Sequence, residues 1–461
     1  MDKNIVSNKQ KWWILAGVAI ASFLGCADFT IVNTALPAIQ NNLHTTISQL
    51  QWIINIFILA LSSFMVIMGR IADIYGRRLI LYTGMIVFAF ASLLAGCAIN
   101  IQWLIFWRFV QGIACAVLYT GSGAIVSNTF PIEERGQAMG IFFGISFTGL
   151  AAGPVLGGIL VGTLGWRWVF LINIPVIIIS LLICAKNLKE SKNIDVNPKL
   201  DYLGTLILMI GISSLIITIT QGSIWGIKSY KTLTTLITTI IAFPLFYYVE
   251  EKSNNPIIKF SLFINRSFIS GTIATFFLAF FYCLAFFLMP LYLREIRGET
   301  DYAIGLMLLP TTIMVSLVSP IIGKMVDRKG PYKPLLFGFI FFIISAILQV
   351  CFSTHTSIVM VLTAFILMGI AWGSIVGPST ILSISGLPRS REALAIGASW
   401  TLHNIGGSIG LSLGVLIYHI ELTKFNNSFL DGFRSAMLLL VFSSLFAFIT
   451  ILWNFHKSKK Q

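Results

Sequence analysis

The chain has 461 residues, of which 57% are hydrophobic and only 10% are charged. Soluble domains carry about 25% charged residues, so the composition excludes a soluble globular domain and indicates a helical protein that crosses a membrane several times. The formal net charge of +14 does not indicate nucleic-acid binding, because the basic residues are scattered over short loops and form no basic stripe.

Fourteen apolar runs are long enough to cross a hydrocarbon core about 30 Å thick. We expect each run to be a transmembrane helix, and the even number places both ends of the chain on one side of the membrane. The predicted limits are 12–38, 50–69, 79–99, 101–128, 137–161, 166–185, 202–221, 232–249, 268–292, 303–323, 335–352, 358–384, 393–418 and 434–455.

The first run contains an acidic residue, Asp28, about 16 residues from its start, which is about 24 Å along a helix. The other 16 of the 17 acidic residues fall in predicted loops, tails or span ends. A carboxylate inside the hydrocarbon core is costly, and such residues usually serve a function. We therefore expect Asp28 to carry the coupling proton of a secondary transporter. The alternative is a structural acid that is satisfied by a neighbouring helix.

A short polar run from Gly69 to Arg78 follows the second predicted span. Gly76 allows a positive φ or a close approach at a tight turn. Asp73 can cap the next helix and pair with Arg77 or another cation. We expect this loop to latch one conformational state and to release in the other. The alternative is a loop whose basic residues serve only the membrane topology.

The fourth predicted span contains Arg108, the basic residue that lies well inside a span. Arginine stays protonated in proteins, so Arg108 can hold a carboxylate or a water without becoming the proton carrier. Burial away from water disfavours a charged carboxylate, and a nearby cation favours it. The alternative is an arginine that only packs helices and bonds to backbone carbonyls. The sequence does not decide whether Arg108 contacts Asp28.

The fifth predicted span contains Gly149, Gly153, Gly157 and Gly158, the first three of which share one face of a helix at a spacing of four residues. Small residues at this spacing allow two helices to approach closely. Pro154 in the same run predicts a kink.

The polar stretches of the chain divide it into six, two and six spans, over residues 1–186, 187–267 and 268–461. The two outer parts contain a similar short sequence motif directly after their second span. The first copy is the run 69–78, and the second is the run 323–333, which contains Asp327. Such a repeat predicts two related helical bundles.

The distribution of lysine and arginine predicts the orientation in the membrane. If the N-terminus is cytoplasmic, 23 of the 31 basic residues lie on the cytoplasmic side and seven on the opposite side, with Arg108 inside a span. The positive-inside rule therefore predicts that both termini of this multi-pass protein are cytoplasmic. The expected location is the cytoplasmic (inner) membrane.

Taken in order, these motifs resemble those of the major facilitator superfamily, in particular its fourteen-span drug:proton antiporter branch. The runs 28–37, 69–78, 104–112 and 149–158 are similar to the family's motifs in span 1, in the loop after span 2, in span 4 and in span 5. Ile71 replaces a usual leucine. The resemblance implies an all-α major facilitator fold with two six-helix bundles and two extra central spans.

The resemblance also implies roles for the motif residues. Asp28 and Arg108 are expected to couple protons, and the glycine motif is expected to form a gate contact between spans 5 and 10. The conformational loop is expected to act through Gly69, Asp73, Gly76, Arg77 and Arg78.

One position departs from the branch, which often has an arginine in span 13. Here Gly406 occupies that position, and His403 stands where an asparagine is common. This departure leaves the contribution of the C-terminal bundle to the site open. Polar and aromatic residues within spans are candidates for lining a substrate cavity, namely Asn33, Asn55, Gln111, Tyr282, His403 and Asn404.

The predicted function is proton-driven export of lipophilic or cationic compounds, and the chain is not expected to be an enzyme. A dedicated exporter of an endogenous metabolite, such as a siderophore or an amino acid derivative, would share every motif. A nutrient symporter and a channel fit the motifs less well. The six cysteines form no C-x-x-C pair, and a nucleotide-binding G-x-x-x-x-G-K-[ST] motif is absent. We therefore expect no cofactor, no metal site and no nucleic-acid partner. The expected partners are protons, a small-molecule substrate and the lipid bilayer, with a periplasmic adaptor as a further candidate.

Overall fold

The computed structural model describes residues 8–45, 47–190, 201–226, 228–253, 256, 260–299, 301–388, 391–424 and 429–458. Within these residues the chain is helical and contains no strand. Contacts divide it into two compact units. The first comprises residues 1–213, 240–259 and 387–398, and the second comprises residues 214–239, 260–386 and 399–461.

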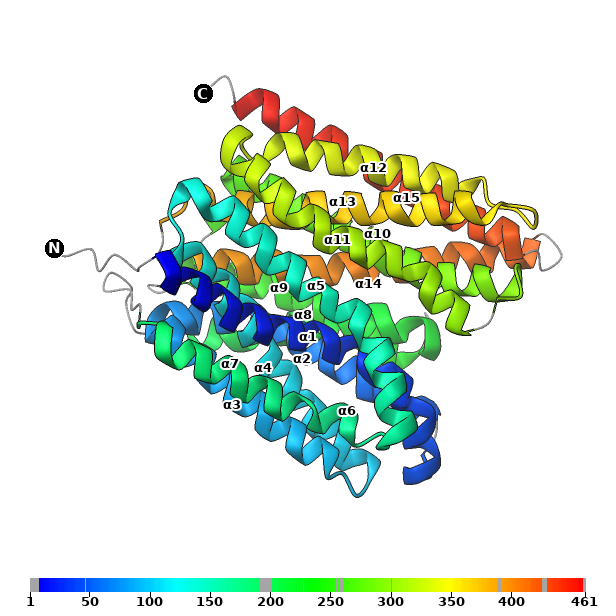
Figure 1. Cartoon of the computed structure of the whole chain (residues 1–461), viewed down its shortest axis with the longest axis horizontal. Coiled ribbons are helices and arrows are strands. Elements are labelled where there is room, and N and C mark those ends of the chain that lie inside the picture. The colour runs from blue at the N-terminus through cyan, green and yellow to red at the C-terminus, as the bar shows by residue number, and fades with distance from the viewer. Residues whose placement is uncertain are drawn as a thin grey trace. The chain divides into compact units, whose positions relative to one another are not determined.

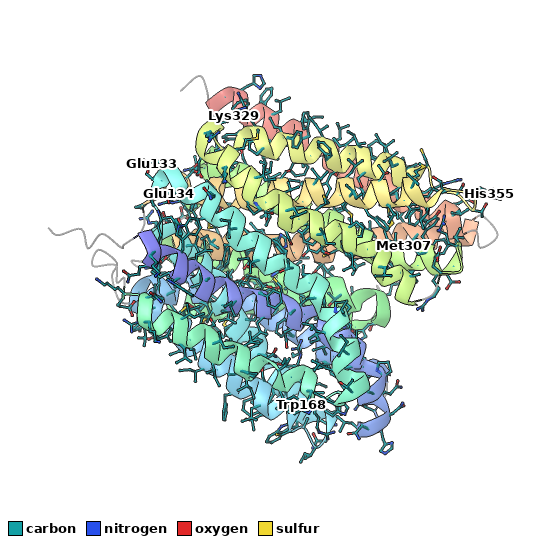
Figure 2. All side chains as sticks on the ribbon, viewed as in Figure 1. Glu133, Glu134, Trp168, Met307, Lys329 and His355 are labelled. Atoms are coloured by element: carbon teal, nitrogen blue, oxygen red, sulfur yellow. The ribbon has the colours of Figure 1, made fainter. Side chains whose placement is uncertain are left out.

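The long helices of the first unit come from the first six predicted spans (Figure 1). Their bounds are α1 (Asn8–Leu43), α2 (Ile47–Tyr75), α3 (Arg77–Gly96), α4 (Ile101–Thr129), α5 (Ile132–Thr163), α6 (Trp168–Leu171) and α7 (Asn173–Asn187). The sixth predicted span is thus a short helix and a longer one that meet at Ile172. Figure 2 labels Glu133 and Glu134 at the start of α5 and Trp168 at the start of α6, which follows the far end of α5.

The second unit contains the last six predicted spans. Their bounds, with the 3-10 helix η1 that precedes them, are η1 (Phe260–Ile264), α10 (Arg266–Glu295), α11 (Asp301–Lys329), α12 (Tyr332–Val350), α13 (Ile358–Ile384), α14 (Glu392–Lys424) and α15 (Phe429–Ser458). The first turns of α14 belong to the first unit. The two central spans, α8 (Tyr202–Trp225) and α9 (Tyr230–Lys252), are divided between the units. The division of the chain into six, two and six spans stays a prediction.

The two units repeat one scheme of helix pairing. In the first unit α4 packs against α1, α2 and α3, and α7 packs against α1 and α3. In the second unit α13 packs against α10, α11 and α12, and α15 packs against α10 and α12. The same turn recurs as well, because Gly76 between α2 and α3 and Gly330 between α11 and α12 both have a positive φ, of 115° and 74°. Both turns belong to the repeated run that the sequence places after the second span of each bundle.

The helices have the length and surface of membrane spans. Thirteen helical segments of the described chain are long and apolar enough to cross a bilayer, and α14 is a further long helix. Large apolar side chains are exposed on both units, for example Phe106 and Leu182 in the first and Phe442 and Trp453 in the second. Such exposed apolar surface suits contact with lipid. The predicted all-α polytopic fold class is confirmed.

Candidate functional site

A buried ion pair lies inside the first unit. Asp28 on α1 and Arg108 on α4 are 0% and 1% exposed, and Arg108 Nη1 donates to Asp28 Oδ2. The contact that the sequence left open is therefore present. The helices bring the residues together because α1 packs directly on α4.

Arg108 has partners besides the carboxylate. Its Nε donates to the backbone carbonyl of Ile53 at 3.2 Å, and its Nη1 donates to Gln111 Oε1 at 3.0 Å. The guanidinium group also lies over the ring of Phe57, 4.1 Å from the centroid, which is a cation–π geometry. The charge of Arg108 would therefore keep three favourable contacts if Asp28 became neutral.

The other oxygen of Asp28 has a partner that the sequence analysis missed. Asn173 Nδ2 donates to Asp28 Oδ1 at 3.0 Å and to Ser92 Oγ at 3.2 Å. Gln111 Nε2 donates to the same Ser92 Oγ at 2.7 Å. Asn173 could have been identified from the sequence, because it is a polar amide within the sixth apolar run. Ser92 could not, because a serine inside a span is common and carries little information.

The predicted conformational loop forms a buried ion pair of its own. Asp73 near the end of α2 and Arg77 at the start of α3 are 2% and 3% exposed. Asp73 Oδ1 accepts from Arg77 Nη2 at 3.0 Å and from Arg77 Nε at 3.2 Å. The predicted pairing of these two residues is thus what the structure shows. Gly69 lies in the same helix, four residues before Asp73.

Gly76 is required at this turn for two reasons. Its φ of 115° is a conformation that other residues rarely adopt, and a Cβ added there would come within 2.6 Å of the carboxylate of Glu190. That carboxylate accepts from the backbone N–H groups of Arg78 and Leu79 at 3.2 and 3.0 Å. Glu190 therefore caps the start of α3, where N–H groups lack partners within the helix. The Arg78 side chain lies over the ring of Tyr82.

The start of α14 docks on the same loop within the first unit. Asp73 Oδ2 accepts from the backbone N–H of Leu394 at 3.2 Å, so one carboxylate serves both Arg77 and a helix N-terminus. The neighbouring Glu392 is 2% exposed and accepts from Ser127 Oγ at 3.0 Å and from Arg135 Nη1 at 3.4 Å. The sequence analysis missed Glu392, because a lone acid in a loop has no recognisable spacing.

The glycine motif of α5 packs against α1. A Cβ added to Gly149, Gly153 or Gly157 would come closer than 3.0 Å to backbone oxygens of α1, whereas one added to Gly158 would meet nothing within 4 Å. The close neighbour of these three glycines is α1. Close packing of small residues is the reason, because the two helices approach along this face. The gate contact with span 10 that the resemblance implied stays a prediction. Pro154 lies inside α5 and is exposed.

In the second unit, His403 on α14 is 2% exposed and hydrogen-bonded at both ring nitrogens. Its Nδ1 lies 2.9 Å from the carbonyl oxygen and 2.9 Å from the Oγ1 of Thr275. Its Nε2 lies 3.2 Å from the hydroxyl of Tyr282. A backbone carbonyl can only accept, so Nδ1 carries a hydrogen. The Tyr282 ring stacks on Trp372 with centroids 4.2 Å apart, and the Trp400 ring lies 4.5 Å from that of His403.

The candidate cavity residues fall into separate places. Tyr282 and His403 are in contact, and Asn404 follows on the same helix and is half-buried. Gln111 belongs to the Asp28 network, with its amide oxygen and nitrogen both engaged. The other two lie on separate helices of the first unit, Asn33 exposed on α1 and Asn55 half-buried on α2. Among the described residues, the charged side chains that are buried all belong to the first unit.

The family model of the Major Facilitator Superfamily matches residues 18–411 of the chain. The chain belongs to the major facilitator superfamily. Superfamily relatives include the multidrug resistance protein Stp of Mycobacterium tuberculosis, which is 31% identical over 88% of this chain and 75% of its own length. The multidrug export protein EmrB of Escherichia coli is 28% identical over 89% and 82%, and the riboflavin transporter RibZ of Clostridioides difficile is 26% identical over 91% of each chain.

The fold also matches solved structures of the superfamily. The human organic anion transporter MFSD10 aligns with a TM-score of 0.67 over 96% of this chain and 99% of its own, at 15% identity. At that identity the likeness supports the fold alone. Together with the family match, the relatives make this chain a small-molecule transporter of a membrane and not an enzyme. The predicted family is confirmed.

The superfamily branch often has an arginine where this chain has Gly406, and the structure shows why an arginine does not fit here. A Cβ added to Gly406 would collide with the backbone carbonyl and the ring of Phe276 on α10. Gly410 and Gly414 pack on Phe280 and Leu284 of α10 in the same way. This face of α14 is therefore a packing surface, as the glycine face of α5 is toward α1.

Proposed function

We propose that the chain is a proton-coupled antiporter that exports lipophilic or cationic small molecules across the cytoplasmic membrane. The observation that supports this most is the buried pair of Asp28 and Arg108. Stability alone does not explain an intramembrane carboxylate, because a buried ion pair often contributes no more to the folding stability than apolar residues packed in its place. A carboxylate that gains and loses a proton has a reason to be there.

In the proposed cycle, a proton from outside neutralises Asp28 and ends its ion pair with Arg108. Arg108 then keeps the Ile53 carbonyl, Gln111 and the face of Phe57, so no unpaired charge is left in the core. Release of the proton to the inside restores the pair and accompanies substrate loading. One proton that moves down about 100 mV supplies about 2.3 kcal/mol, which supports substrate accumulation of tens-fold.

The loop with Asp73 is the proposed conformational latch. In the structure its carboxylate holds Arg77 and the first turns of α14 at once. Separation of α14 from the loop would break the hydrogen bond to Leu394 but keep the one to Arg77. The latch can therefore open without leaving Asp73 uncompensated. We further propose that both termini are cytoplasmic. Gly158, whose added Cβ would meet nothing within 4 Å, is the proposed gate-facing member of the glycine motif.

Two separate groups of residues are proposed to contact substrate, namely Asn33 and Asn55 in the first unit and Tyr282, His403 and Asn404 in the second. Stacked aromatic rings beside His403 suit flat, lipophilic molecules through stacking and cation–π contacts. Export of an endogenous metabolite is the second candidate function. The similarity to a riboflavin transporter favours it, because that relative is named for a flat aromatic metabolite. A periplasmic adaptor stays a candidate partner.

Proteoliposomes test the proposal. Wild-type protein and Asp28→Asn are reconstituted and loaded with ethidium, a flat lipophilic cation, or with riboflavin. A pH gradient should drive wild-type transport of at least one of them, and Asp28→Asn should lose this transport because its amide cannot titrate. Exchange of substrate without a gradient should survive in the variant. Gradient-driven transport by well-folded Asp28→Asn protein would exclude Asp28 as the carrier.

A further inference from the structure

Asn173 occupies a special place in the first unit. It is the first residue of α7, directly after Ile172, and it is 1% exposed. Its side-chain nitrogen donates to Asp28 Oδ1 at 3.0 Å and to Ser92 Oγ at 3.2 Å. An ionised carboxylate can only accept, so the amide must present its nitrogen to Asp28.

The contacts of Asn173 close a ring of hydrogen bonds. From Asp28 the ring runs to Arg108, to Gln111, to Ser92, to Asn173 and back to Asp28. It ties together α1, α3, α4 and α7, and all five side chains are buried. We propose that Asn173 is a positioning residue for the proton carrier: it holds the second oxygen of Asp28 and favours the ionised form. This role rests on the proton-coupled function proposed above.

The effect of Asn173 on protonation follows from its hydrogen bond. An N–H that donates to a carboxylate stabilises the charged form more than the neutral form. Of the ionisable groups on the helices packed around Asp28, Arg108 contacts it directly, and the buried thiol of Cys115 interacts with it electrostatically; both are on α4. The described contact from α7 comes from the uncharged amide of Asn173, and the uncharged Ser92 on α3 joins Asn173 to Gln111. Loss of Asn173 therefore removes the hydrogen bond to Asp28 Oδ1.

The position of Asn173 also gives protonation a route to the sixth span. A neutral Asp28 is a weaker acceptor for both Arg108 and Asn173. Its contacts to α4 and to α7 therefore weaken in the same step. Because Asn173 is the first residue of α7, the start of this helix is the part of the span whose contact with Asp28 weakens.

The test uses Asn173→Leu, which keeps the volume of the side chain, and Asn173→Ala. Asn187→Ala is the matched control, since Asn187 is on the same helix and donates to the Ile183 carbonyl away from the ring. Full-length protein is reconstituted with ethidium as the probe, and counterflow and gradient-driven uptake are measured over a range of pH, beside wild type and Asp28→Asn.

Both Asn173 variants should keep counterflow, with its half-maximal pH moved by about one unit toward alkaline, because the lost donor had favoured the ionised carboxylate. The control should keep the wild-type midpoint. A wild-type midpoint in both variants, or joint loss of counterflow and uptake, overturns the proposal. If wild type shows no gradient-driven uptake, the proposed function itself fails. If Asp28→Asn retains this uptake, Asp28 is not the carrier and the role of Asn173 fails with it. If Asp28→Asn loses uptake while the Asn173 variants behave as wild type, only the role of Asn173 fails.

Discussion

Replacement of Arg108 by leucine is the most informative perturbation of the buried ion pair. Of the contacts described above, Asp28 would keep only the N–H of Asn173. Removal of one partner from a buried ion pair costs about 3–5 kcal/mol, because the other charge is left uncompensated. Asp28→Asn should cost less, about 1–3 kcal/mol, since Arg108 keeps Ile53, Gln111 and Phe57.

Thermal unfolding of purified protein in detergent measures this asymmetry. Arg108→Leu should unfold at a lower temperature than Asp28→Asn near neutral pH. The difference should shrink at acidic pH, because a protonated carboxyl group carries no charge that needs a partner. The double variant Asp28→Asn/Arg108→Leu should be more stable than Arg108→Leu alone. Equal losses in the two single variants at both pH values, with no recovery in the double variant, would refute the reasoning.

Three further predictions concern packing, the latch and the topology. Gly153→Ala should destabilise the protein by about 1–3 kcal/mol in thermal unfolding, whereas Gly158→Ala should change stability by less than about 0.5 kcal/mol. Similar losses of stability in the two variants would contradict the packing of α5 on α1. Asp73→Asn should lower the transport rate about tenfold, because it weakens the hydrogen bonds of a charged group. The substrate affinity in equilibrium binding should stay unchanged. An unchanged transport rate would refute the proposed role of this loop as a conformational latch. In protein without native cysteines, Asn42→Cys should react with an impermeant thiol reagent from outside intact cells and Lys189→Cys should not. Labelling of position 189 from outside would show that the predicted membrane orientation is wrong.

Much of the fold could be predicted from the residues alone. Long apolar runs must be helical in a bilayer, where every backbone group needs a partner within the segment. The repeated glycine turn was visible as two similar runs, at Gly76 and Gly330. The single acid inside a span identified Asp28 as the centre of the candidate site, because charge in the hydrocarbon core is rare and costly.

The partners of these residues could not be predicted, because they come from other helices. Asn173 lies 145 residues from Asp28 in the chain, and Leu394 lies 321 residues from Asp73. Which side chains meet depends on how each helix is rotated and on how closely its neighbours approach, and sequence spacing within one helix carries no information about that. The partner of the α5 glycine motif is α1 for the same reason.

The sequence by itself therefore determined the class of protein, its helical spans and the residue on which proton coupling is proposed to depend. Each of these follows from the energy of placing a chain in a bilayer. The tertiary structure decided how the charge of Asp28 is compensated, which helices share its hydrogen-bonded ring and why glycine stands at position 406. Each of these depends on contacts between helices, and such contacts exist only once the helices are packed.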